Sequence, residues 1–419
     1  MKWLLHLLAI SISLGLLSAT AAQIYEDNLP ADHAAIEYAK APVDDPVSRL
    51  ARQIEAGKAR LEFNPARFGY LPSLLANLGI QTDSQALVFS KTGLQATKTS
   101  PRAPRAIYFT DDVAVGMVQG GENLELAALD PRQGVIFYTL SVGQSERPQF
   151  IRRDTCLTCH QGPATAGIPG IYIASVFTRS SGAVDFGAGT IVTDHRTAFD
   201  DRWGGWYVTG THGEMRHRGN AVSLDPVNPK LLETLDTQNL TSLVKKIDTN
   251  RYLLPTSDLV ALMTLEHQTQ MTNLIIRAGW QARIDAGSPK VASAIDDLVR
   301  YMFFTDEIAL KSPIRGESSF MKTFPQRGQR DRKGRSLREF DLQKRLFRYP
   351  LSYMVYSEAF DALPDVVRSA VYQKIYQVLT GEDASDRFAK LSAQDRTAIL
   401  EILRDTKTNL PAYWSSAVR

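Results

Sequence analysis

The chain has 419 residues, of which 44% are apolar and 22% charged, so it can bury a sizeable core without metals or a disulfide framework. Its 48 basic and 45 acidic residues leave a net charge of +3, which gives no reason to expect nucleic acid or an anionic membrane as the main partner. The length allows about two or three domains, or one large domain with elaborations.

The N-terminus has the pattern of an export signal. Lys2 precedes an apolar run over residues 3–17, and the small residues Ala19-Thr20-Ala21 follow. We therefore expect a signal peptide over residues 1–21 and a periplasmic protein. A retained membrane anchor is the alternative, but the run is short for a span, and no later segment reaches the ~18 apolar residues of a transmembrane helix.

The next segment is mostly helical in pattern. Apolar positions are sparse over residues 31–60, where Pro42 and Pro46 interrupt the run, and a shorter helix is expected over residues 71–78. We treat residues 22–85 as a helical lead-in.

From residue 86 onward the apolar residues alternate as they do in strands. Two such runs joined by a turn with proline and glycine predict a β-hairpin, and a second hairpin is expected around a Ser-Ser-Gly turn. We therefore expect a β-rich region over residues 86–225. Its expected strands cover residues 87–89, 107–109, 113–117, 124–128, 135–140, 171–178, 189–193 and 203–209.

The C-terminal half has helical periodicity, and the boundary is placed at the proline-rich residues 225–229. The fold class expected is therefore α+β, with a β-rich middle followed by a mainly helical region over residues 226–419. Its expected helices cover residues 256–278, 292–309, 352–363, 366–379 and 397–407.

Both cysteines of the chain lie in one motif, Cys156-Leu157-Thr158-Cys159-His160. This spacing is that of a c-type haem attachment site. Residues three apart share one face of a helical turn, so two sulfurs can reach the two vinyl groups of a porphyrin and the adjacent imidazole can bind the iron. The haem would be held covalently.

The two cysteines have three other interpretations. A thioredoxin-like dithiol opens a helix in a parallel α/β domain, whereas the surroundings here are antiparallel in pattern. Structural zinc needs four ligands, which two cysteines do not supply. A plain disulfide would close too short a loop to add much stability.

The pentapeptide resembles the haem-binding motif of c-type cytochromes, and the likeness extends to the export signal and little further. The resemblance implies that Cys156 and Cys159 carry one covalent haem c and that His160 is the proximal iron ligand. It also implies electron transfer with redox partner proteins. The mature chain is several times longer than the small single-haem carriers, so it is closer to a large exported single-haem protein.

Candidates for a sixth iron ligand follow the motif. His267 lies at helical spacing from Met263 and Met271, so it belongs to an apolar stripe of the expected helix. The alternative to iron ligation is that His267 is a core histidine satisfied by a hydrogen bond. His217 and Met215 belong to a polar loop over residues 211–217. We rank His267 first, His217 second and Met215 third.

Two further features of the sequence bear on a haem site. The aromatic residues Phe199, Trp203, Trp206 and Tyr207 are expected either to wall a porphyrin or to pack in the core. Residues 315–348 hold eleven Lys or Arg against four Asp or Glu, which indicates a solvated loop or a cationic surface for a redox partner or the haem propionates.

Two main functions remain open from the sequence. The first is electron transfer through a six-coordinate haem. The second is a haem enzyme, such as a peroxidase or a small-molecule oxidoreductase, with an open distal site and His267, Glu266 or an arginine as acid–base groups. A haem-based sensor is a third possibility. Nothing in the sequence distinguishes a sensor from an electron carrier or an enzyme.

Overall fold

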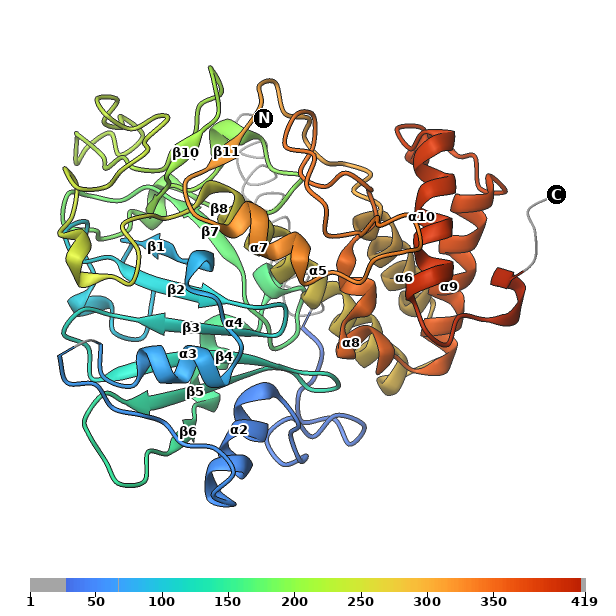
Figure 1. Cartoon of the computed structure of the whole chain (residues 1–419), viewed down its shortest axis with the longest axis horizontal. Coiled ribbons are helices and arrows are strands. Elements are labelled where there is room, and N and C mark those ends of the chain that lie inside the picture. The colour runs from blue at the N-terminus through green and yellow to red at the C-terminus, as the bar shows by residue number, and fades with distance from the viewer. Residues whose placement is uncertain (1–27, 67, 416–419) are drawn as a thin grey trace, which may run out of the picture.

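The computed structural model describes residues 28–66 and 68–415, and its largest sheet has seven antiparallel strands (Figure 1). The strand order is β6-β5-β4-β3-β2-β1-β9, so sequence neighbours pair from β1 to β6 and β9 forms the far edge. The expected α+β class is confirmed. The strands are β1 (Ala86–Val88), β2 (Arg105–Phe109), β3 (Val113–Met117), β4 (Asn123–Asp130), β5 (Gly134–Ser141), β6 (Phe150–Arg152) and β9 (Trp206–Tyr207).

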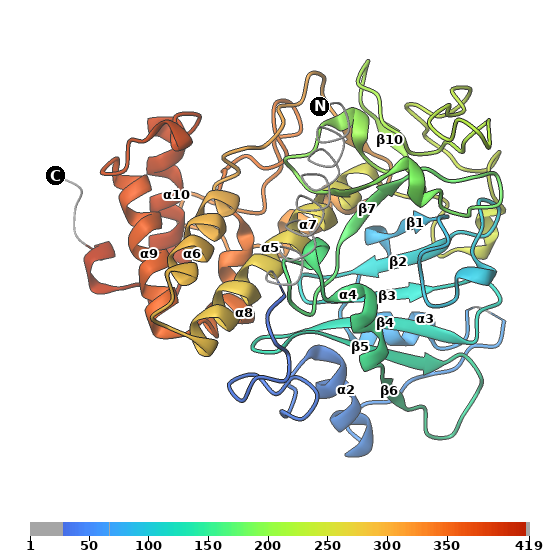
Figure 2. The same cartoon turned by 180° about the vertical axis from the view of Figure 1, so that it is seen from behind.

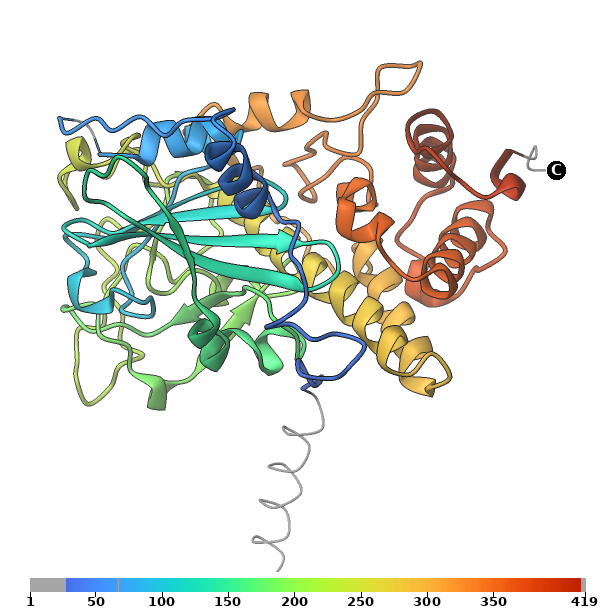
Figure 3. The same ribbon diagram turned by 90° about the horizontal axis from the view of Figure 1, so that it is seen from below.

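The two faces of the sheet have different coverings (Figure 3). Helices α2 (Pro46–Glu55) and α3 (Leu71–Asn77) lie on one face, where the Tyr138 hydroxyl donates to Asp45 Oδ2 at 2.7 Å. The opposite face carries the short helix α4 (Leu157–His160) and the strand pair that follows it. The motif therefore lies against the second face.

The lead-in is less helical than residues 31–60 were expected to be. Residues 31–41 form turns, and α2 begins only at Pro46, because the Asp45 carboxylate caps it by accepting from the N–H groups of Val47 and Ser48. Proline at the first helical position has no N–H to lose, so it starts the helix that we expected it to interrupt.

Helix α5 (Leu259–Ile284) is the central element of the fold and confirms the helix expected over residues 256–278. It is buried on nearly every side for its 26 residues, as a helix enclosed by other elements must be. Asp258 caps its first turn. In Figures 1 and 2 this helix runs between the sheet and the C-terminal helices.

The C-terminal helices are α6 (Pro289–Met302), α7 (Phe320–Gln326), α8 (Glu358–Asp361), α9 (Asp365–Thr380) and α10 (Ala393–Thr406). Helices α6, α9 and α10 pack on one another beyond α5, whereas α7 and α8 pack on α5 itself (Figure 1). The helix expected at 352–363 is instead a 3₁₀ turn followed by one short helix, and a short helix in the basic segment was not expected.

The second expected hairpin is confirmed as β7 (Ile173–Val176) paired with β8 (Thr190–Thr193). A further pair, β10 (Gly210–Thr211) with β11 (Arg315–Gly316), crosses the expected boundary at residue 225. Ser257 crosses it as well, since its hydroxyl accepts from the Leu87 N–H. The β-rich and helical regions therefore share contacts, and the division of the chain remains a prediction.

No helix among residues 28–66 and 68–415 is both long and apolar enough to cross a membrane. The expected signal peptide, residues 1–21, lies outside the described residues.

Candidate functional site

The cysteine motif forms one short turn of helix on the sheet face. A 3₁₀ turn at Asp154–Cys156 leads directly into α4. The thiols of Cys156 and Cys159 are free, the first half-buried and the second exposed. Burial raises the pKa of the Cys156 thiol. Both sulfurs are thus placed on one helical turn with no bond between them, which is the arrangement that thioether attachment requires.

Reciprocal hydrogen bonds hold His160 in place. Its Nδ1 lies 3.0 Å from the Gly170 carbonyl oxygen, and the Gly170 N–H donates to the His160 carbonyl oxygen at 2.9 Å. The Nδ1 atom must carry the hydrogen to donate to a carbonyl, which leaves a lone pair on Nε2. Burial lowers the pKa of His160, so the ring is neutral near pH 7. A neutral imidazole with Nδ1 tied to a carbonyl is the usual form of a histidine that binds a metal through Nε2.

The loop after the motif is anchored to the central helix. The Asn273 side-chain amide on α5 donates to the Ile171 carbonyl at 2.9 Å. Gly170 leaves room for this side chain, because a Cβ at position 170 would lie 2.2 Å from Asn273 Oδ1. The loop that carries the Gly170 carbonyl is therefore anchored to α5 at the next residue, Ile171.

The sheet offers an apolar surface beside the His160 ring. The Phe137 ring centroid lies 4.7 Å from that of His160, and the Tyr172 ring centroid lies 5.7 Å from it. Strand register places Ala114 and Ala127 on the same face as Phe137, and both alanines are partly exposed. A flat apolar ring fits small side chains of this kind, so the residues present are compatible with haem.

One ion pair lies close to the motif. Arg105 on β2 contacts Glu125 on β4 at 3.0 Å, and both side chains are largely buried. Their charges act on His160, where Arg105 lowers its pKa and Glu125 raises it. Within the described part of the chain, no group of three or more His, Cys, Asp or Glu side chains is placed to hold a metal ion.

His267 lies elsewhere on α5 and is fully buried. Both of its ring nitrogens are occupied, since Nδ1 lies 3.0 Å from His195 Nδ1 and Nε2 lies 2.8 Å from the Ser352 hydroxyl. Ligation of iron by His267 would have to replace one of these bonds. A role as sixth ligand stays a prediction.

His217 and Met215 are also buried. His217 Nδ1 accepts from the Gly219 N–H at 3.0 Å, and Met215 Sδ lies 3.4 Å from the Lys311 nitrogen. Within residues 28–66 and 68–415, no hydrogen bond or ring contact joins His160 to His267 or His217. Their ranking as ligands likewise remains untested.

The aromatic residues considered as porphyrin walls pack in the core. Trp203 is fully buried and contacts Phe199 at 5.0 Å between ring centroids. Trp206 and Tyr207 form β9 at the sheet edge opposite β5 and β6, whereas the motif contacts β5. Core packing accounts for all four.

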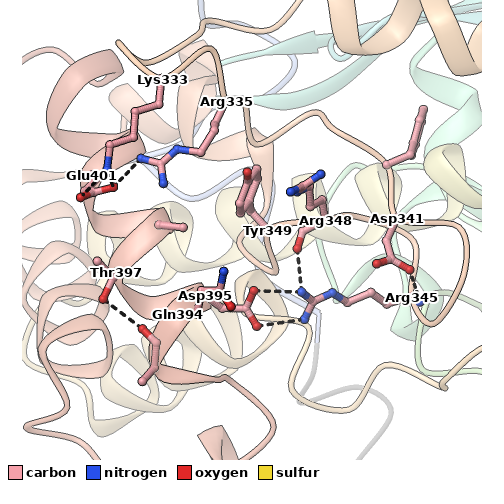
Figure 4. A pocket seen from close by; sticks show the side chains of 13 residues that line it. Lys333, Arg335, Asp341, Arg345, Arg348, Tyr349, Gln394, Asp395, Thr397 and Glu401 are labelled. Atoms are coloured by element: carbon pink, nitrogen blue, oxygen red, sulfur yellow. Dashed lines mark hydrogen bonds and ion pairs between the residues drawn. The ribbon is translucent and has the colours of Figure 1, made fainter.

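The basic segment 315–348 forms one wall of a cavity of about 820 Å³ against α10 (Figure 4). Four of its eleven Lys and Arg side chains, Arg332, Lys333, Arg335 and Arg345, pair with carboxylates of α10. Arg335 and Lys333 share Glu401 at 2.6 and 2.8 Å, and Arg345 contacts Asp395 at 3.0 Å. Ion pairs therefore hold part of the segment against α10. The segment is not simply a solvated loop, because it contains α7 and buries Phe320, Phe324 and Leu337.

Comparison with known proteins adds nothing to this geometry: no family model, no curated protein and no solved structure matches the chain.

The sequence did not identify Gly170, Phe137, Tyr172 or the pair Arg105–Glu125 as neighbours of the motif. Alternation in the predicted hairpin could have placed Phe137 and Glu125 on one sheet face, but it could not say which face the motif covers. The role of Gly170 depends on a backbone carbonyl, which carries no signal in the sequence.

Proposed function

We propose that this protein is an exported c-type cytochrome that carries one covalent haem and transfers electrons. Cys156 and Cys159 would form the thioether bonds and His160 would be the proximal iron ligand. The observation that carries the proposal is the pair of hydrogen bonds between His160 and Gly170, which fixes the ring and leaves Nε2 free next to two unpaired thiols.

The bound haem would supply an iron that gains and loses one electron. The protein's own residues would set its surroundings. The hydrogen bond from His160 Nδ1 to Gly170 strengthens the imidazole as a ligand, and Asn273 holds the loop that carries this carbonyl. Phe137, Ala114 and Ala127 would exclude water from one side of an apolar ring.

Export to the periplasm and exchange of electrons with redox partner proteins belong to the same proposal. Covalent attachment prevents loss of the cofactor outside the cell, and the N-terminal sequence has the pattern of a signal peptide.

The test is a haem stain on a denaturing gel of exported protein produced with cytochrome maturation enzymes. The wild type should retain haem, and the double variant Cys156→Ala/Cys159→Ala should not. Thr158→Ala is the matched control, because it changes the same exposed turn without removing a sulfur. A wild-type band without haem, or a double variant that keeps it, would overturn the proposal.

Absorption and paramagnetic resonance spectra distinguish electron transfer from the alternative of a haem enzyme. A low-spin wild type favours a six-coordinate carrier, and a high-spin wild type favours an enzyme with an open distal site. His267→Ala should convert a low-spin spectrum to high-spin if His267 is the sixth ligand. An unchanged low-spin spectrum would exclude it.

A further inference from the structure

The carbonyl that bonds to His160 lies between two anchored peptide groups. A backbone N–H of β5 donates to the Pro169 carbonyl at 2.9 Å, one residue before Gly170. The Asn273 amide on α5 donates to the Ile171 carbonyl at 2.9 Å, one residue after it. The position of the Gly170 carbonyl oxygen therefore depends on a strand on one side and on a helix on the other.

Asn273 also packs directly against Gly170. Its side chain is fully buried, and a Cβ at position 170 would lie 2.2 Å from Oδ1 and 3.0 Å from Cγ. Only glycine leaves space for the amide at this distance. The amide in turn limits how far the loop can move toward α5, so its contact and its hydrogen bond together define where the loop lies.

Packing alone does not account for an amide at position 273. Asn273 Oδ1 is buried and has no hydrogen-bond partner among the described residues. Leaving such an acceptor unpaired costs about 1–3 kcal/mol, which an apolar side chain of similar size would avoid. What the amide adds is the N–H group that donates to Ile171, and this bond holds the loop next to His160.

A second side chain of α5 holds the other end of the same loop. Arg277, four residues later and thus on the same face of the helix, donates to the Ala166 carbonyl at 2.5 Å. Residues 166–171 are therefore attached to α5 at both ends. Loss of the Asn273 bond would release only the end that carries Gly170, while Arg277 keeps the rest of the loop on the helix.

The bond from His160 Nδ1 to this carbonyl bears on how strongly the imidazole donates through Nε2. Ferric iron carries the higher charge, so a strong donor stabilises it more than it stabilises ferrous iron and lowers the reduction potential. A carbonyl that is free to move away weakens the bond. The reduction potential should then rise.

We propose that Asn273 is a positioning residue that sets the reduction potential of the haem by holding the loop whose Gly170 carbonyl bonds to His160. The proposal rests on the function proposed above, since it presumes iron at His160 Nε2. Asn273 itself touches neither His160 nor the cofactor in this account, and it acts through the backbone of Gly170 and Ile171.

The first test is a redox titration of the full-length haem protein, followed by its absorption spectrum. Asn273→Ala should favour the ferrous state about fivefold, which is a rise of about 40 mV at 59 mV per tenfold change. Gln268→Ala is the matched control, because Gln268 is also buried on α5 and donates to a backbone carbonyl, that of Thr110, at 2.6 Å. Its potential should equal that of the wild type.

The second test needs no haem. In the variant Cys156→Ala/Cys159→Ala, labelled with ¹⁵N-histidine, the His160 Nδ1 hydrogen should exchange slowly with solvent because it is bonded to Gly170. Adding Asn273→Ala should speed this exchange about tenfold, whereas adding Gln268→Ala should not. The signal is assigned by its loss in His160→Phe.

If Asn273→Ala does not fold, Gly170→Ala perturbs the same contact from the loop side and should raise the potential as well. An unchanged potential in these variants, an equal rise in Gln268→Ala, or unchanged exchange at His160 would each overturn the role of Asn273. A wild type without haem would instead overturn the proposed function, so the two failures are distinguishable.

Discussion

Replacing Glu266 by glutamine should change how the stability of the protein depends on pH. Glu266 is fully buried on α5, next to His267 in the chain, and Arg202 contacts its carboxylate at 3.2 Å. Burial raises the pKa of Glu266 from 4.5 to about 7, even though Arg202 acts in the opposite direction. The folded state therefore holds a proton that the unfolded chain has already released.

The size of the effect follows from this difference. Between pH 4.5 and about 7 the folded state binds one more proton at this site than the unfolded state, so stability falls as pH rises. The slope is about 1.4 kcal/mol per pH unit, which gives about 3 kcal/mol over the interval. Below pH 4.5 both states are protonated and the contribution is fully present. Glutamine cannot titrate, so Glu266→Gln removes this dependence.

The assay is urea denaturation of the wild type and Glu266→Gln at half-unit steps between pH 4 and pH 8. The free energy of unfolding of the variant, minus that of the wild type, should rise by about 3 kcal/mol across the range. Asp297→Asn is the control, because it makes the same chemical change at an exposed carboxylate on α6. Parallel curves for the wild type and Glu266→Gln would refute the reasoning.

Two further predictions concern the supports of the site. Gly170→Ala forces a methyl group against Asn273 Oδ1 and should lower the free energy of unfolding by about 1–3 kcal/mol in urea, with part of the loss recovered when Asn273→Ala is added. Strict additivity of the two changes would argue against this contact. Asp45→Ala removes both the cap of α2 and the partner of Tyr138, and should cost about 1–3 kcal/mol, whereas the exposed neighbour Asp44→Ala should cost less than about 1. Equal losses in the two variants would contradict that assignment.

The features that the sequence predicted well are those set by local pattern. Strand alternation predicted the hairpin of β4 and β5, and the Ser-Ser-Gly turn predicted that of β7 and β8, because both depend on neighbouring residues. The central helix α5 was found for the same reason, although it extends six residues beyond the expected end at 278.

The parts that the sequence did not predict depend on contacts between distant segments. Helix α2 is shorter than expected, because the Asp45 side chain caps it and the helix begins only at Pro46. The apolar pattern of residues 31–60 did not indicate this start. Gly170 lies ten residues after His160 and contacts the histidine ring through its backbone carbonyl oxygen. Every residue type has such a carbonyl, so the sequence does not reveal this contact. The pairing of β10 with β11 joins residues about a hundred positions apart, which no local periodicity could reveal.

His267 illustrates the same limit at the level of a single residue. The apolar stripe on α5 correctly indicated a buried histidine. Its two partners, His195 and Ser352, come from a loop after β8 and from the segment before α8, so the hydrogen-bonded chain could not be read from helical spacing.

The most direct test of the account is mass spectrometry of mature protein isolated from its native host. The peptide that contains Cys156, Cys159 and His160 should carry the mass of one haem, with both sulfurs alkylated by the porphyrin and neither accessible to a thiol reagent. The same peptide with two free thiols, or with a disulfide between them, would contradict the central claim.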